Sequence, residues 1–144
     1  MEKPVNIQNR KAGYDYHFLE KYEAGVQLLG SEVKSIKAGR VTLVDSFCYF
    51  DNGELWCKAM TITPVDANYV HEPQRNRKLL LHRKELNKLE NSLVKGMTIV
   101  ITHVYSTNGK IKFGIALAKG KRDYDKRQAI KEREAQKEIN SEQL

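Results

Sequence analysis

Apolar and polar residues alternate over much of the chain. Between Tyr14 and Leu29, aromatic and aliphatic residues mostly share one parity and charged residues the other. This period of two predicts a strand with one buried face, in which Gly25 marks a bulge. Two Asn-Gly turns each separate a pair of apolar segments and predict hairpins, because these residues tolerate positive φ. The predicted hairpin strands are 41–50 with 54–60 and 97–106 with 110–118.

Two segments predict helices between these strands. The first is short, from Glu32 to Lys37, and ends at Gly39. The second extends from about Arg77 to Lys95 and stops at Gly96. One face of this second helix is expected to carry Leu79, Leu86, Leu89 and Leu93.

A sheet of five or more antiparallel strands in a short chain must close on itself or have its edges covered, because open sheet edges pair with other chains. We therefore predict a mainly β fold: an antiparallel barrel with two or three flanking helices. Strands interrupted by one central helix also match the plan of the oligonucleotide-binding (OB) barrel. The 144 residues suit one domain and a tail.

Charge divides the chain into residues 1–118, the predicted barrel domain with a short flexible N-terminus, and residues 119–144, a basic tail. Lysine and arginine number 25 against 18 acidic residues, a net charge of +7. This excess favours a polyanionic partner, nucleic acid or an anionic membrane surface. Few apolar residues lie in the tail, so we expect it to be disordered when free and to form a helix on a surface that neutralises it.

Signatures of enzymes and metal sites are missing from the sequence. There is no phosphate-binding glycine loop and no zinc-binding motif, and the four histidines have no common metal spacing. We expect no cofactor, and Cys48 and Cys57 to be small buried residues. The sequence has no stretch apolar enough to span a membrane and no secretory signal, which favours a cytoplasmic protein.

Basic residues interleaved with aromatic or imidazole rings predict contacts with RNA, since guanidinium groups bind phosphates and rings stack on unpaired bases. Arg10 and Tyr16 belong to one cluster; Arg77, Lys78 and His82 belong to a second. Either cluster could instead be a solvated charged face. Glu23, between Tyr22 and Ala24, is either a solvent-facing strand residue or an acceptor for base or sugar donors.

Three segments together resemble one family. NRKAGYDYHFLEKYEAGVQLLGSEVKSIKAGR, NYVHEPQRNRKLLLHRKEL and GIALAKGKRDYDKRQAIKERE are similar, in order and spacing, to small protein B, the SsrA-binding protein of bacterial trans-translation. The resemblance implies a non-enzymatic, monomeric factor. It would bind the tRNA-like domain of transfer-messenger RNA (tmRNA) and deliver this RNA to stalled ribosomes, where the incomplete peptide is tagged and the ribosome released.

Matching motifs imply two sets of contact residues. On the barrel, the RNA-binding residues would be Asn9, Tyr16, Glu23, Leu80, His82 and Lys112. In the tail, residues for the ribosomal decoding centre and empty mRNA channel would be Lys119, Gly120, Lys121, Arg122, Tyr124, Asp125, Lys126, Arg127, Ile130, Lys131 and Arg133. Tyr124 stands where many members have His, and His82 where many have Asn.

Three alternatives remain at this point. A general RNA-binding barrel would share the charge and rings without a link to tmRNA. An enzyme acting on RNA would need a paired acid and base or a metal cluster, which the spacing does not indicate. A membrane-surface protein would need a tail with an apolar face of Trp, Phe and Leu, which this tail lacks.

Overall fold

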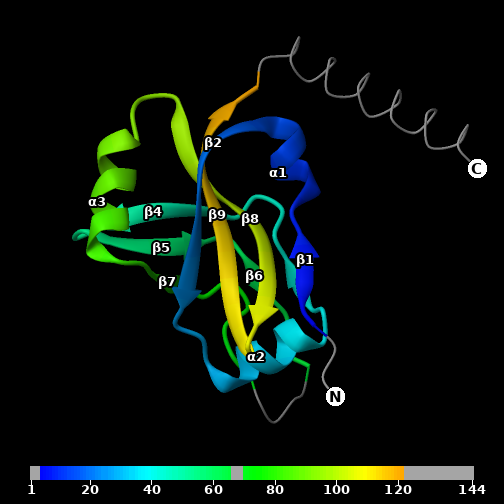
Figure 1. Cartoon of the computed structure of the whole chain (residues 1–144). Coiled ribbons are helices and arrows are strands. Elements are labelled where there is room, and N and C mark those ends of the chain that lie inside the picture. The colour runs from blue at the N-terminus through cyan, green and yellow to red at the C-terminus, as the bar shows by residue number, and fades with distance from the viewer. Residues whose placement is uncertain (1–3, 66–69, 122–144) are drawn as a thin grey trace, which may run out of the picture.

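The computed structural model describes residues 4–65 and 70–121 (Figure 1). Within these ranges the protein is mainly β. The strands are β1 (Asn6–Gln8), β2 (Tyr16–Val26), β3 (Val41–Thr42), β4 (Phe47–Asp51), β5 (Glu54–Lys58), β6 (Thr61–Ile62), β7 (Arg77–Leu80), β8 (Met97–Thr107) and β9 (Lys110–Gly120). The helices are α1 (Arg10–Asp15), α2 (Gly30–Lys37) and α3 (Arg83–Ser92).

Six strands pair in a closed circuit. The order is β2, β7, β5, β4, β8, β9 and then β2 again, every pair being antiparallel. β1 adds to β8 outside the circuit, and β3 pairs separately with β6. Because each of the six strands has a partner on both sides, the prediction of a mainly antiparallel β fold that covers its edges is confirmed.

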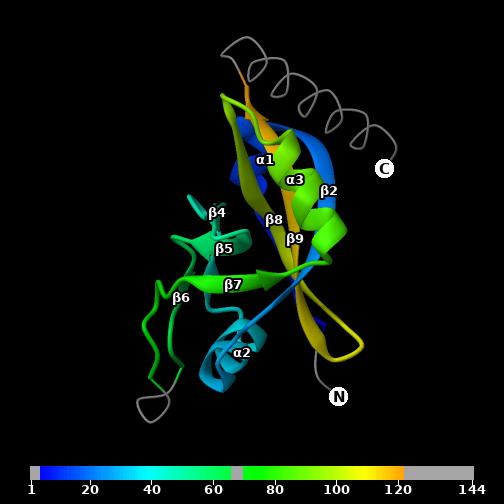
Figure 2. The same ribbon diagram turned by 90° about the vertical axis from the view of Figure 1, so that its left-hand side faces the viewer.

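The helices lie at different ends of the sheet. Two views at right angles show α2 at one end and α1 and α3 toward the other (Figures 1 and 2). Leu86 and Leu89 of α3 are buried in the main core, beside the inward residues of β8 and β9. α1 covers a smaller apolar cluster, where Ala12 packs with Val100 and Ala116.

Both Asn-Gly hairpins are confirmed. Asn52 and Gly53 have φ values of 52° and 77°, and Asn108 and Gly109 have 51° and 77°. Positive φ at both central residues of a turn matches the twist of the flanking strands. The first predicted strand of the 41–60 pair is interrupted, however: β3 and β4 are separate, and Asp45 between them has φ 66°.

The helix predicted from Arg77 to Lys95 is observed only over Arg83–Ser92, as α3, so the prediction is wrong over its first six and last three residues. Residues 77–80 form β7, which pairs with β5 and β2. Burial alternates there, since Arg77 and Leu79 are buried and Leu80 is exposed. This alternation is not apparent from the sequence, because the inward residue Arg77 is charged and a charged residue is expected to face solvent.

α1 and the bulge of β2 also differ from the prediction. Tyr14 and Asp15 belong to α1 rather than to the strand, which begins at Tyr16. The register shift between β2 and β9 falls between Phe18 and Glu20, not at Gly25. Gly25 instead lies opposite Leu80 on β7, where the two chains approach closely.

β9 is longer than the predicted domain. Lys119 is paired with both His17 and Met97, and Gly120 with Tyr16. Strand β9 therefore continues two residues past the predicted boundary between residues 118 and 119. The predicted disorder and latent helix of the tail lie outside the described residues.

Candidate nucleic-acid interface

An open groove of about 460 Å³ lies where β2, β7, β9 and the start of α3 meet. Its floor is Gly25 of β2. A Cβ built on Gly25 would lie 3.4 Å from Leu80 Cβ and 3.7 Å from Lys112 Nζ, so the glycine leaves open the space between these two side chains. Leu80 is 45% exposed, which is unusual for a leucine on a strand. The groove thus presents an apolar wall opposite an ammonium group.

Both signs of charge line this Leu80 groove. Glu23 and Glu85 contribute carboxylates, and Lys112 and His82 contribute nitrogen donors. Glu85 also accepts a hydrogen bond from the His82 backbone N–H at 3.2 Å, so His82 is fixed as the residue that starts α3. An apolar side chain can pack against an exposed base while lysine meets phosphate and glutamate accepts from base or sugar. The groove is suited to an unpaired nucleotide.

Four of the predicted RNA contacts therefore come together: Glu23, Leu80, His82 and Lys112. They derive from three segments far apart in the chain: β2, the junction of β7 with α3, and β9. On the predicted helix, Leu80 falls just beside the face of Leu79, Leu86, Leu89 and Leu93, a position that leaves room for exposure. Its exposure is observed, but the reason is the outward parity of β7 rather than a helix face.

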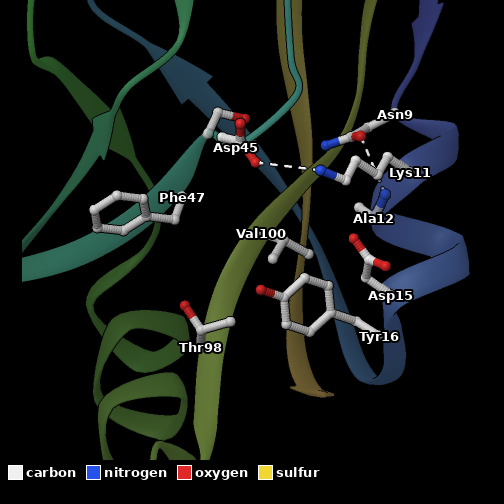
Figure 3. A pocket seen from close by; sticks show the side chains of 10 residues that line it. Asn9, Lys11, Ala12, Asp15, Tyr16, Asp45, Phe47, Thr98 and Val100 are labelled. Atoms are coloured by element: carbon white, nitrogen blue, oxygen red, sulfur yellow. Dashed lines mark hydrogen bonds and ion pairs between the residues drawn. The ribbon is translucent and has the colours of Figure 1, made fainter. Parts of the chain in front are cut away.

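Tyr16 and Asn9 lie in a different pocket of about 310 Å³ between α1, β8 and the segment that precedes β4 (Figure 3). Lys11 spans its mouth to reach Asp45, with 3.6 Å between Nζ and Oδ1. Tyr16 and Phe47 enter from opposite sides (Figure 3). This pocket and the Leu80 groove share no residue, so the candidate contacts form two separate surfaces.

The Asn9 side chain is occupied by the fold. Its amide nitrogen donates to the Ile101 carbonyl at 2.9 Å and to the Leu43 carbonyl at 3.3 Å, and its oxygen accepts from the Ala12 backbone N–H at 3.2 Å. These bonds cap α1 and fix it to β8. Because Asn9 is buried and fully bonded, we withdraw it as a direct RNA contact.

Arg77 is also wrong as an RNA contact. It is 0% exposed, with Nε donating to Glu32 Oε2 at 2.5 Å and the other nitrogens donating to the Met60 and Pro73 carbonyls at 2.9 and 3.1 Å. Arg75 completes the same cluster at Glu32 Oε1, 2.5 Å away. A buried guanidinium must be paired, and here it joins β7 to α2.

The remaining basic candidates are accessible. Lys78 is half-buried on β7 and forms an ion pair of 2.8 Å with Glu54. Arg10 is exposed on α1, away from the Leu80 groove. Lys121, a predicted ribosome contact, donates from its backbone to Asp15 and from Nζ to the Gly13 carbonyl, at 2.8 and 3.2 Å. The other tail candidates after Lys121, residues 122–133, lie outside the described part of the chain.

The described residues contain no group of three or more His, Cys, Asp or Glu placed to hold a metal ion. Nor does any helix there have the length and apolar character to cross a membrane. Cys48 and Cys57 are buried opposite each other on β4 and β5, as predicted. Burial, followed by the hydrogen bond and charge of Cys57, raises the pKa of Cys48, which favours the protonated thiol.

Four residues of the groove region were not predicted as site residues, and Leu81 in the lining is one of them. Gly25 forms the floor, Glu85 lines the wall, and Tyr105 on β8 donates a hydrogen bond to Glu23. A glutamate three residues after the start of a helix is a known capping signal and could have indicated Glu85. Nothing local indicates Tyr105, which is 82 residues from Glu23.

Fold and surface together define a small antiparallel β protein with an open groove of mixed apolar and charged character. The family model described as SmpB protein matches residues 6–143. The chain is 49% identical to the SsrA-binding protein of Streptococcus mutans over 138 residues, 94% of this chain and 89% of the relative. It is 50% identical to that of Sulfurihydrogenibium sp., covering 96% and 93% of the two chains.

A solved structure is also similar. Its description is "tmRNA-SmpB: a journey to the center of the bacterial ribosome"; it is 41% identical, with a TM-score of 0.70, and the match covers 88% of this chain and 94% of that one. The chain belongs to the SmpB protein family. The resemblance seen in the three sequence segments is confirmed.

Proposed function

We propose that this protein binds tmRNA (SsrA RNA) and brings it to stalled ribosomes in trans-translation. The relatives are SsrA-binding proteins, and the similar solved structure is of tmRNA and SmpB in the ribosome. The observation that carries the proposal is the Leu80 groove, because it joins an exposed leucine, a lysine and carboxylates drawn from distant segments. Such a surface recognises an unpaired nucleotide by shape and contacts, not by charge alone.

In this proposal the groove residues Glu23, Leu80, His82 and Lys112 hold the tRNA-like domain. Tyr16 and Arg10 form the second surface, around α1, and Lys78 adds phosphate contacts. We further infer that the closed strand circuit is a barrel of the OB type, which presents RNA on its outer face. The circuit of six strands supports closure; the placement of a helix between its strands supports the OB plan.

The tail from Lys119 is proposed to contact the decoding region, and the stretch after Ile130 to enter the empty mRNA channel as a helix. Ordering a charged tail costs conformational entropy, so it should dock only where ribosomal RNA supplies dense negative charge and no mRNA blocks the path. The protein would act in the cytoplasm as a monomer and a positioning factor, not as an enzyme.

A titration against the isolated tRNA-like domain tests this function. Bulk tRNA serves as competitor, and the titration is repeated at two salt concentrations, because affinity from phosphate contacts alone falls steeply with salt. We expect tight binding that survives competitor and salt. Binding that collapses under either condition would instead indicate a general basic RNA-binding protein.

A further inference from the structure

Glu23 is an exposed carboxylate held in place from another strand. The Tyr105 hydroxyl on β8 donates a short hydrogen bond to Glu23 Oε2 on β2. Strand β9 lies between these two strands, so the tyrosine ring reaches across a whole strand to make the contact. Partial burial, together with the Glu23 hydrogen bond and charge, raises the pKa of Tyr105 to about 12. Its hydroxyl therefore stays a donor at physiological pH.

Gly114 makes this reach possible. It is the residue of β9 paired with Glu23 on one side and with His103 on the other. A Cβ at this position would lie 2.2 Å from His103 Cε1, a distance that real Cβ atoms do not adopt. The imidazole thus lies over the bare glycine backbone, in the space that a side chain would take.

His103 in turn supports the tyrosine ring. The two rings are stacked, with centroids 4.6 Å apart and an interplanar angle of 15°. A register shift between Ile101 and His103 turns the histidine to this outer face, and Thr102 Oγ1 lies 2.8 Å from its Nδ1. A stacked ring and a hydrogen-bonded imidazole leave Tyr105 little rotational freedom.

We propose that Tyr105, supported by His103, is a positioning residue that fixes the Glu23 carboxylate at the wall of the Leu80 groove, ready to accept hydrogen bonds from a base or sugar. This rests on the proposed function of that groove. A carboxylate has about four acceptor positions, and Tyr105 uses one of them, which leaves Oε1 open to the ligand. Glu23 is exposed, so without Tyr105 its side chain would rotate freely in the unbound protein. That freedom would be lost when RNA binds, and the entropy cost would lower the affinity.

Tyr105→Phe tests the proposal, because it keeps the ring and the stack and removes only the hydroxyl. Affinity for the isolated tRNA-like domain is measured in a double-mutant cycle with Glu23→Ala. In the chain that retains Glu23, Tyr105→Phe should lower the affinity about threefold to tenfold, because the Glu23 side chain then regains its rotational freedom in the unbound protein. In the Glu23→Ala background the same change should alter affinity less than about twofold, since no carboxylate remains to be fixed.

Tyr22→Phe is the matched control. Its hydroxyl donates to Glu20 Oε2 at 2.7 Å rather than to Glu23, and the pKa of Tyr22 is likewise raised to about 12, by burial, by Glu20 and by the charge of Glu85. Removing this hydrogen bond should leave RNA affinity unchanged. Thermal unfolding of all variants shows whether a loss of affinity reflects a loss of fold.

Gly114→Ala is a second variant that retains both Tyr105 and Glu23. Its methyl group should displace the His103 ring and lower affinity in the same Glu23-dependent way. Wild-type affinity for folded Tyr105→Phe, or an equal loss with and without Glu23, would overturn the positioning role and leave the proposed function standing. Failure of the wild-type protein to prefer the tRNA-like domain over tRNA would instead overturn the proposed function itself.

Discussion

Gly25 decides the shape of the Leu80 groove. Gly25→Ala adds a methyl group 3.4 Å from Leu80 Cβ and 3.7 Å from Lys112 Nζ, which are ordinary contact distances, so the protein should still fold. The methyl group occupies the floor on which a base would rest. We expect affinity for the tRNA-like domain to fall about tenfold, roughly the 1.4 kcal/mol lost when one good contact is blocked.

Gly30→Ala is the control for this prediction. Gly30 is the first residue of α2, outside the Leu80 groove and the surface around α1, and a Cβ there meets nothing within 4 Å. Alanine in a helix should stabilise the protein by up to about 1 kcal/mol and leave RNA binding unchanged. Equal affinities for the Gly25→Ala and wild-type proteins would show that the nucleotide does not use this floor.

Neighbouring leucines on β7 should respond in opposite ways. Leu79 is 2% exposed in the core, so Leu79→Ala should cost about 2–5 kcal/mol of unfolding free energy. Leu80 is 45% exposed, so Leu80→Ala should cost less than about 1 kcal/mol but weaken RNA binding. Urea unfolding and RNA titration of both variants measure the two effects. A strongly destabilised Leu80→Ala would mean that its exposed side chain serves the fold.

At the scale of elements, α2 is fastened to β7 by one buried carboxylate. Glu32 is 0% exposed and accepts from Arg75, Arg77 and the Leu29 backbone N–H. Burial alone would raise the pKa of Glu32, but these hydrogen bonds and the Arg77 charge outweigh it, and the pKa lies below its ordinary value of 4.5.

This lowered pKa gives a pH dependence with a definite sign. A carboxyl group whose pKa is lower in the folded state contributes stability above its unfolded pKa of 4.5, and that stability is lost as the pH falls through the folded value. Glu32→Gln should be less stable at pH 7 by about 3–5 kcal/mol, because Arg77 stays buried without a counter-charge. Unfolding in urea at pH 7, 5 and 3 measures the free energy of unfolding of the wild type and of Glu32→Gln. The difference between the two values should become smaller at pH 3. A difference in unfolding free energy that is the same at all three pH values would show that Glu32 does not cause the loss of stability in acid.

The elements that the sequence predicted correctly have local causes. The two hairpins follow from Asn-Gly turns, and the end of α2 follows from Gly39, which has φ 76°. β7 could not be predicted in this way, because three leucines in succession fit a helix equally well and only pairing with β5 and β2 selects a strand. The buried Arg77 has a partner, Glu32, 45 residues away, which no local pattern indicates.

At the scale of the whole molecule, the groove depends on how distant segments meet. Family motifs indicated Glu23, Leu80, His82 and Lys112 one by one, and the closed strand circuit brings them to one place. The motif that indicated Asn9 and the basic cluster that indicated Arg77 could not reveal that both serve the fold, because the same polar residue type can bond to the protein or to a ligand. Burial decides between the two roles, and burial is a property of the folded chain.

The extended β9 changes where the tail should be cut. Lys119 and Gly120 belong to the sheet, and Lys121 is bonded to α1 through its backbone and its ammonium group. A chain ending at Ala118 should lose about 1–3 kcal/mol of stability, since several hydrogen bonds of about 0.5–1.5 kcal/mol each disappear. A chain ending at Lys121 should unfold like the full protein.

The truncation at Lys121 separates the proposed RNA contacts of the folded part from the proposed ribosome contacts of the tail. The chain ending at Lys121 keeps the Leu80 groove, so its affinity for the tRNA-like domain should stay within about threefold of that of the full protein. Its affinity should depend less steeply on salt only if lysines and arginines of the tail contact this RNA. The truncated chain should nevertheless fail to tag peptides on stalled ribosomes, because the proposed decoding-region residues from Arg122 onward and the stretch after Ile130 are gone. Tagging that persists without residues 122–144 would assign ribosome binding to the folded body. A uniform loss of RNA affinity would make the tail, rather than the groove, the main RNA-binding element.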